Sequence, residues 1–411
     1  MLFGNQRARK GELSSPARFV SFALMKRTAS TIVAILFSAS ASFAELPDSF
    51  ADNIAAIQAI GSEGAGNKEA TTAWQAIAKA DGEAILPLLQ AMEAASPVSK
   101  NMLRSAVEVI SENELAAGKK LPVDSLGTFV LNTSGSPQAR RFAFDLLSQV
   151  DSAGARKLVP GFINDPAVSL RREAVTGVMI AGKAQLEKDK DAAAKLYREA
   201  LNAARDVDQI DEITKTLREL GQEVNLPKHF GFLMDWKLIG PFDNSERAGY
   251  DTVFPPENEI KLDATYDGKG TAKVKWVAFT SADEYGMIDF NKPFTSMKEV
   301  VGYAHTEFEA AEAGPAELRL GCKNAWKIWF NGELIFARDE YHRGARIDQY
   351  ILPIRLSKGT NTILVKACQN ETDESWTVQW EFQLRICDST GTAILATNRK
   401  KAVVAPPAKK K

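Results

Sequence analysis

The sequence CKNAWKIWFNGELIF at residues 322–336, followed by QYILPIRLSKGTNTILVKAC at residues 349–368, decides the fold of the second half of the chain. Within it, Asn331 and Gly332 separate two apolar runs. Both central positions of a two-residue type I′ turn need φ > 0, which Asn and Gly tolerate, so a β-hairpin is predicted here. The Lys-Gly-Thr-Asn segment at 358–361 predicts another turn, leading into a strand over 362–367.

The rest of residues 225–396 continues this pattern of short apolar runs and turns. Further strands are expected at 273–279, 300–309, 316–320 and 376–386. Strands of this length and spacing are typical of two packed antiparallel sheets. The segment is therefore predicted to be an antiparallel β-sandwich.

Residues 45–224 have a different periodicity, with apolar residues at i, i+3 and i+4 in Ala- and Leu-rich segments, which predicts helices. An Arg-x-Ala-apolar motif recurs with its arginine at 104, 141 and 172, each time shortly after a loop proline at 97, 137 or 166. We interpret each unit as a helix, a turn and a second helix whose Ala permits close packing, with the Arg at its flank. Because one such pair cannot bury its apolar face alone, neighbouring pairs must stack, and an α-solenoid is predicted.

Residues 164–174, NDPAVSLRREA, resemble the HEAT-repeat signature, and the other two motif copies match it more loosely. The segments 85–89 and 158–162 are expected to be corresponding first helices. Residues 191–220 are similar to a tetratricopeptide helix pair and are expected to cap the stack. The resemblance implies an elongated surface suited to a protein partner.

The N-terminal residues predict export. Lys26 and Arg27 precede an apolar run at 31–37, and Ser42-Phe43-Ala44 has the small residues that a signal peptidase reads. We expect translation to start at Met25, a signal peptide within 1–44, cleavage after Ala44, and a secreted or periplasmic protein. The alternative is a membrane anchor, but the apolar run is shorter than a bilayer span, so no stable span is expected.

The net charge of the chain bears on its possible partners. Without residues 1–44, which contain six basic residues and one acidic residue, 45 basic and 51 acidic residues remain, a net charge of −6. Nucleic acid is therefore not expected as a partner.

Cys322, Cys368 and Cys387 are compatible either with one disulfide and a spare thiol or with three buried thiols. The Ala/Pro/Lys-rich residues 397–411 are expected to be a disordered tail.

Five segments of the second half carry a resemblance to a known domain: 236–242, 328–335, 356–366, Trp376 and 382–388. Together they resemble the jelly-roll sugar-binding domain of glycoside hydrolase family 2 enzymes and other galactose-binding-like modules, over residues 230–390. The resemblance implies that the hairpin and the 358–361 turn are architectural, and that a ligand would bind at the loop end. The catalytic carboxylates of that enzyme family belong to a separate barrel domain, which no part of these 411 residues is predicted to form.

Sequence motifs for catalysis, metal or cofactor binding are lacking. The histidines His229, His305 and His342 are too far apart for a zinc motif, and there is no nucleophile elbow, phosphate loop or dinucleotide fingerprint. The acidic segment 370–375 could hold calcium or simply turn the chain, but the calcium-loop pattern is absent. Adjacent carboxylates such as Asp339 and Glu340 would point to opposite faces of a strand, a poor arrangement for a glycosidase. No catalytic residue, metal or cofactor is predicted.

The loop 338–346 is the densest group of charged, polar and aromatic residues. Sugar recognition combines an aromatic plane with bidentate groups for hydroxyls, which this loop could supply. Because side chains alternate along a strand, Trp326 and Trp329 must face opposite sides, one in the core and the other exposed or covered by the helices. The candidate ligand-binding residues are Trp329, Arg338, Asp339, Tyr341, His342 and Arg343. The alternative is a solvated loop whose charges pair among themselves.

The sequence thus predicts an α-solenoid followed by a β-sandwich, acting as a non-catalytic exported binding or scaffold protein for a carbohydrate or protein partner. A hydrolase, glycosidase-like and with its site in the sandwich loops or between the domains, is the alternative. A third hypothesis is a structural protein whose sandwich only caps the helical stack.

Overall fold

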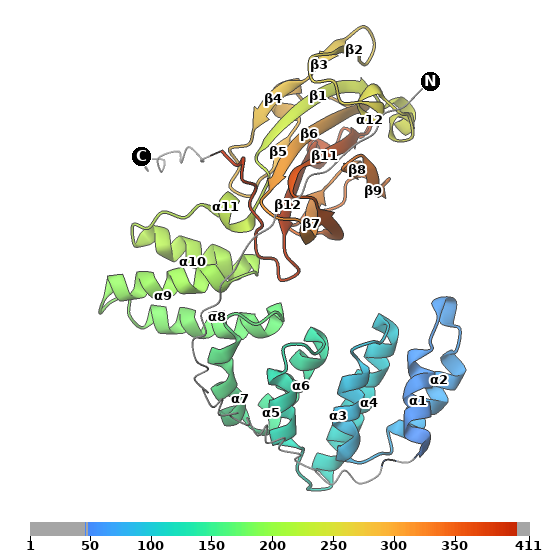
Figure 1. Ribbon diagram of the computed structural model, residues 1–411, viewed down its shortest axis with the longest axis vertical. Coiled ribbons are helices and arrows are strands. Elements are labelled where there is room, and N and C mark those ends of the chain that lie inside the picture. Colours follow the sequence, from blue (N-terminus) through green and yellow to red (C-terminus); the bar gives the residue numbers. More distant parts are fainter. Residues whose placement is uncertain (1–45, 47, 401–411) are drawn as a thin grey trace, which may run out of the picture. The chain divides into compact units, whose positions relative to one another are not determined.

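The computed structural model describes residues 46 and 48–400 (Figure 1). The predicted signal peptide with its cleavage site, and residues 401–411 of the expected tail, lie outside this range. The first part of the described chain is helical, as predicted. Its helices are α1 (Asp48–Gln58), α2 (Asn67–Ile77), α3 (Ile85–Ala91), α4 (Pro97–Ala116), α5 (Val123–Leu131), α6 (Pro137–Val150), α7 (Ser152–Leu158), α8 (Val168–Lys183), α9 (Lys190–Ala203), α10 (Val207–Glu219) and α11 (Leu226–Phe230).

The loop prolines mark helix starts. Pro97 and Pro137 occupy the first turn of α4 and α6, where a missing N–H costs nothing, and the hydroxyls of Ser96 and Ser136 cap the two helices. Residues 158–162 differ from the expectation of an α-helix. There α7 ends at Leu158 and a 3₁₀ turn follows over Val159–Phe162, because Pro160 cannot donate the hydrogen bond that would continue the helix.

The motif arginines lie at the helix flanks, and each reaches the following unit. The contacts are Arg104 above the ring of Phe142 (4.7 Å), Arg141 with Glu173 (2.6 Å) and Arg172 with Asp208 (2.5 Å). Their neighbour Arg140 is instead fully buried and donates two hydrogen bonds to Asp165, of 2.8 and 2.6 Å. Each motif arginine thus contacts a residue about one helical unit further along the chain, and this shared role explains why the motif recurs.

The second part is built from antiparallel strands. They are β1 (Asp235–Asp243), β2 (Thr265–Asp267), β3 (Lys273–Lys275), β4 (Val277–Thr280), β5 (Ile288–Asp289), β6 (Val300–Ala310), β7 (Gly314–Cys322), β8 (Ala325–Phe330), β9 (Glu333–Arg338), β10 (Tyr350–Leu356), β11 (Gly359–Gln369) and β12 (Glu381–Cys387). Two short helices, α12 (Pro255–Asn258) and α13 (Asn291–Phe294), lie between strands. One sheet has the order β4-β1-β6-β11-β8-β9, another β10-β7-β12-β5, and β2 pairs with β3 (Figure 1).

Two expected strands differ in the structure. The strand expected over 273–279 is divided at Trp276, because β3 pairs with β2 whereas β4 pairs with β1. The strand expected over 376–386 begins only at Glu381, since residues 375–377 form a 3₁₀ turn. Trp376 therefore lies in a loop, which changes its possible role.

The predicted hairpin is confirmed. Asn331 and Gly332 have φ of 51° and 83°, as a type I′ turn requires, and they join β8 to β9. Asn361 of the second turn is buried, and its side chain hydrogen-bonds the backbone N–H and C=O of Ser357. Both turns are thus part of the framework of the sheets.

The six-stranded and the four-stranded sheet share one hydrophobic cluster. Trp326 of β8, which is 1% exposed, lies in it together with Leu318 of β7 and Leu384 of β12. Trp329 is on the opposite face of β8 and packs, half-buried, against a second cluster that also contacts Tyr341. The predicted alternation of the two tryptophans is confirmed.

The three cysteines are buried with free thiols, and burial raises the pKa of Cys322 and Cys368 to about 12. At the C-terminal side, residues 397–400 are not free of the sheets, although a tail was expected from residue 397. Arg399 donates a hydrogen bond to the carbonyl of Phe232, and Lys400 pairs with Asp235. These contacts tie the last described residues to the segment around the start of β1.

Candidate functional site

Three loops begin at the same end of the six-stranded sheet. In the order β4-β1-β6-β11-β8-β9 with antiparallel neighbours, every second strand runs in the same direction. Strands β1, β11 and β9 are therefore parallel to one another, and the loops that follow Asp243, Gln369 and Arg338 start at the same end of the sheet. Topology alone places segments here that are more than 90 residues apart in sequence.

Five side chains of these loops form a surface that we call the loop platform: Arg247, Tyr341, His342, Glu371 and Trp376. The His342 ring meets the Trp376 ring edge-on, with centroids 5.3 Å apart and an interplanar angle of 82°. The guanidinium of Arg247 lies 5.2 Å from the centre of the Tyr341 ring. Trp376 is 60% exposed, so it presents the platform's open aromatic surface.

Buried amides hold the platform in place. Asn244 is fully buried, and its side-chain nitrogen donates to the Tyr341 hydroxyl (3.2 Å) and to the carbonyl of Gln369 (2.9 Å). Asn370 is 1% exposed, and its side-chain oxygen lies 2.7 Å from Nε2 of His342. Each amide belongs to one loop and fixes another, so the three loops are mutually positioned.

The charges of the platform are paired but accessible. Arg247 donates from Nε and Nη2 to the two carboxylate oxygens of Glu371, at 3.1 and 2.5 Å, and the two side chains are 49% and 50% exposed. The hydrogen bond from Arg247 lowers the pKa of Glu371 to about 2. Burial raises the pKa of Tyr341, so its hydroxyl stays protonated. The surface therefore offers both hydrogen-bond donors and acceptors without a large net charge.

Two platform residues have an unusual backbone conformation. Arg247 and His342 have φ of 64° and 58°, in the left-handed region that costs a non-glycine residue about 1–2 kcal/mol. Conformations of this kind concentrate at binding sites, where the surrounding structure imposes them. The surrounding contacts thus impose the backbone conformation at these two positions of the loop platform.

The structure brings together only some of the six predicted site residues. Tyr341 and His342 belong to the loop platform, but Arg247 covers the Tyr341 ring. Arg343 is exposed and pairs with Glu340 at 3.0 Å, so that part of the loop's charge is internally paired. Asp339 is exposed, and its charge acts on both Arg247 and Tyr341, so it lies close to the platform. Arg338 is exposed beside the Phe336 ring, and Trp329 packs on the outer face of β8 against the same cluster as Tyr341.

Sequence reasoning missed Arg247, Glu371 and Trp376 as site residues. The signal that could have identified them is the strand order, because loops after alternate strands of an antiparallel sheet meet at one end. Within residues 46 and 48–400, no group of three or more His, Cys, Asp or Glu side chains could hold a metal ion. The same described helices include none that is long and apolar enough to cross a membrane.

No family model and no curated protein matches this chain. Among solved structures, similarities extend to the PA14 domain of the antifreeze protein MpAFP (13% identity, 25% of this chain and 56% of that one, TM-score 0.17) and to a β-glucuronidase from Ruminococcus gnavus (15% identity, 38% and 28%, TM-score 0.22). A β-glucosidase from Kluyveromyces marxianus is 9% identical over 72% of this chain and 37% of that one, with a TM-score of 0.23. The chain thus spans between about a quarter and just over half of these proteins. At such TM-scores the similarities define neither its fold family nor its function.

Proposed function

We propose that this chain is an exported, non-catalytic binding protein that recognises a carbohydrate through the loop platform. In this proposal the sheets form a jelly-roll sandwich whose loop end carries the ligand, and the helices form a HEAT-like solenoid that can contact a protein partner. Export rests on the sequence features of residues 1–44, which the structure does not describe.

The exposed ring of Trp376 is the observation that carries the proposal. This ring is open to a ligand on a surface that also offers hydrogen-bonding groups, and a sugar ring presents an apolar C–H face of suitable size. Around it, Arg247 and Glu371 supply the planar donor and acceptor groups that bind hydroxyl pairs. Since these two charges are paired with each other, an uncharged sugar suits the platform better than an acidic one.

The test is a glycan array probed with the mature chain, followed by calorimetry on the best ligand. Trp376→Ala should weaken binding about fivefold or more, because stacking on an aromatic ring is worth about 1–3 kcal/mol. Its midpoint of thermal unfolding should stay near that of the wild type, since the ring is exposed. Ile180→Ala, which removes another exposed apolar side chain on α8, is the matched control and should bind normally. Silence across the array, or full binding by Trp376→Ala, would overturn the proposal.

A glycosidase-like hydrolase is the second candidate, and one carboxyl group favours it. Glu381 opens β12 and is the cross-strand partner of Asp289 on β5. Burial, and then the charge of Asp289, raise the pKa of Glu381, as a general acid requires. If the chain is a hydrolase, it should release the leaving group from aryl glycosides, and Glu381→Gln should abolish that activity. A wild-type chain inactive on such a panel would eliminate this candidate.

A further inference from the structure

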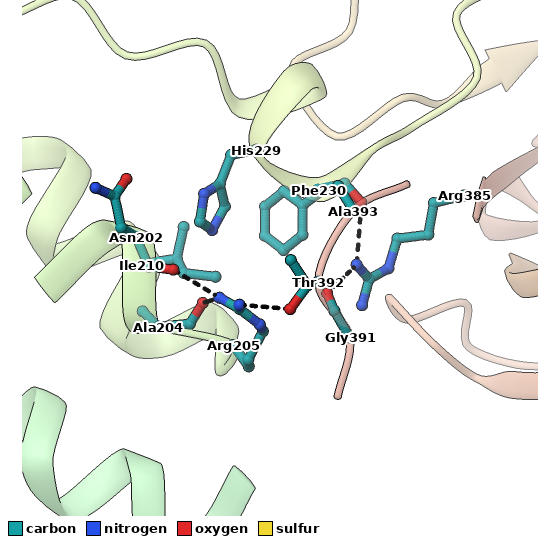
Figure 2. Close-up of a pocket in the computed structure, with 10 residues that line it drawn as sticks. All are labelled: Asn202, Ala204, Arg205, Ile210, His229, Phe230, Arg385, Gly391, Thr392 and Ala393. Atoms are coloured by element: carbon teal, nitrogen blue, oxygen red, sulfur yellow. Dashed lines mark hydrogen bonds between the residues drawn. The ribbon is translucent and has the colours of Figure 1, made fainter. Parts of the chain in front are cut away.

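A small cavity lies between the end of α9, the short helix α11 and the turn that follows β12 (Figure 2). Its volume is about 110 Å³, and its polar lining comes from Asn202, Arg205, His229, Arg385 and Thr392. This space would hold roughly three to four water molecules at the volume that each takes in the liquid. It is separate from the loop platform and uses none of its residues.

Arg385 has a complete set of partners. Its Nε and Nη2 donate to the two carboxylate oxygens of Asp348, at 2.7 and 2.5 Å. Its Nη1 donates to the carbonyls of Phe230 and Gly391, at 3.0 and 3.1 Å (Figure 2). This arginine is therefore neutralised and held by the protein itself.

Arg205 differs from Arg385, because it makes no ion pair with a carboxylate of the described residues. Its Nη1 donates to the backbone carbonyls at the end of α9, and its Nη2 donates to the hydroxyl of Thr392 at 2.7 Å (Figure 2). Its Nε is buried and has no hydrogen-bond partner. One N–H and one positive charge of this side chain thus remain without a counterpart.

The charges around the cavity do not balance. Four arginines, Arg171, Arg205, Arg319 and Arg385, are grouped with three carboxylates, Glu317, Asp348 and Asp388. Arg319 contacts both Glu317 and Asp348, so these two carboxylates offset Arg319 and Arg385. Asp388 faces both Arg171 and Arg205, and it already accepts hydrogen bonds from the backbone of Thr390 and Thr392. Asp165 also lies near Arg171, but its two carboxylate oxygens are bound by the buried Arg140. One positive charge is left over.

The excess charge has a measurable consequence for Arg205. Burial, and then repulsion by Arg171, lower the pKa of its guanidinium to about 10. An uncompensated charge away from water is unfavourable, and a bound anion would relieve it. The planar guanidinium is also the side chain best suited to two-point recognition of a carboxylate or phosphate.

We propose that this cavity binds a small oxyanion, a carboxylate or phosphate group, held by Arg205, Thr392 and His229. The inference does not depend on carbohydrate binding at the loop platform. Since the lining comes from α9, α11 and the turn after β12, the bound anion would also connect these three segments. It would act as an effector or a structural ligand, with no chemical step of its own.

His229 supplies a direct reporter of occupancy. Burial, followed by the charges of Arg205 and Arg385, lowers the pKa of its imidazole to about 4. An anion placed between these groups attracts the protonated ring and must raise that pKa. NMR titration of His229 in the full chain, with and without inorganic phosphate, which is still an anion near pH 4, should therefore show a rise of about one unit or more. Chloride at equal ionic strength should leave the pKa unchanged.

Thermal unfolding gives a second readout. At ten times its dissociation constant, the bound anion should raise the midpoint by about 2 °C or more, because it binds only the folded chain. Comparison of phosphate with acetate identifies which oxyanion the cavity prefers. Arg205→Gln should remove both the shift and the change at His229. Arg198→Gln should keep them, because Arg198 lies within α9 and its guanidinium donates to the carbonyl of Glu223.

Because Arg205 also holds the end of α9, its substitution could impair folding. Thr392→Val is the second variant, since it removes one hydroxyl at the cavity and leaves the arginine in place. It should weaken anion binding several-fold and leave glycan binding unchanged. Equal responses to phosphate, acetate and chloride, or an undiminished response in both Arg205→Gln and Thr392→Val, would overturn the inference.

Discussion

Lys366 and Arg247 each pair with a glutamate, but one pair is buried and the other is open to water. The Lys366 side chain is 0% exposed, and its ammonium donates to Glu257 (2.8 Å) and to the carbonyls of Tyr250 and Thr252. The Tyr303 hydroxyl also donates to Glu257. Every donor of the lysine is used, so nothing remains for a ligand. Arg247 and Glu371 on the loop platform are half-exposed and keep free edges.

The difference separates framework from site. The Lys366 network fastens the segment before and including α12 to the outer face of β11, where hydrophobic packing alone would leave polar backbone groups unpaired. The Arg247–Glu371 pair joins two loops at the end of the sheet. Arg247 has a strained backbone conformation, and the exposed Trp376 belongs to the same platform. Substitutions should therefore affect stability in the first region and ligand binding in the second.

Lys366→Met should give the largest effect on stability. The variant keeps most of the side-chain volume but leaves Glu257 buried without its cation, which typically costs 3–5 kcal/mol. Urea unfolding followed by circular dichroism measures the change. Adding Glu257→Gln to this variant should recover part of the loss, because the uncompensated charge is removed.

The matched control for Lys366→Met is Lys273→Met, which removes an exposed lysine that pairs with Asp267 on the β2–β3 hairpin. Exposed pairs of this type contribute about 0–1 kcal/mol. If the two variants lost similar stability, burial would not be what distinguishes the two regions, and the comparison would fail.

Local signals predicted much of the framework. The hairpin followed from Asn331 and Gly332, because these residues tolerate positive φ. Pro97 and Pro137 were expected in the loops before the second helices, and the structure places them in the first turn of those helices. Residues 158–162 and 376–380 were harder, since apolar residues there suit helix, strand or turn equally well and tertiary pairing decides. Strand order was not predicted, because pairing partners such as β1 and β6 are distant in sequence.

The candidate site was predictable only where it is continuous in sequence. Tyr341 and His342 stand out in a loop rich in polar residues, and the structure places both on the platform. Arg247 and Trp376 come from loops on either side of that segment, about 90 and 35 residues away, and only the direction of the strands brings them there. The cavity residues Arg205 and Thr392 could not be predicted for the same reason, because they are 187 residues apart in sequence and only the fold brings them together.

A paired substitution at Arg247 measures the strain on the platform. Arg247→Ala and Arg247→Gly both remove the guanidinium, but only glycine adopts φ near 64° without steric cost. The glycine variant should therefore be more stable than the alanine variant by about 1 kcal/mol in urea unfolding. Both should bind the platform ligand more weakly than the wild type.

The control for this pair lies on a helix, at Arg104 of α4, which is exposed and forms an i,i+4 pair with Glu108. In a helix interior the order reverses, and Arg104→Gly should be less stable than Arg104→Ala by about 1 kcal/mol. The same order at both positions would show that the backbone at Arg247 is not constrained in the left-handed region.

Glu371→Gln should give the smallest effect on stability, and its pH dependence has a definite sign. The folded-state pKa of Glu371 is about 2, below its ordinary value of 4.5, because Arg247 stabilises the carboxylate. The stabilisation is therefore complete above about pH 4.5 and disappears as the pH falls toward 2. Since both side chains are half-exposed, solvent screening limits this stabilisation to less than about 1 kcal/mol.

The free energies of unfolding of wild type and Glu371→Gln should thus differ slightly at pH 7 and converge near pH 2. A salt concentration of 1 M should also bring the two values together. A difference that persists under both conditions would mean that the Arg247–Glu371 pair behaves like the buried Lys366 pair.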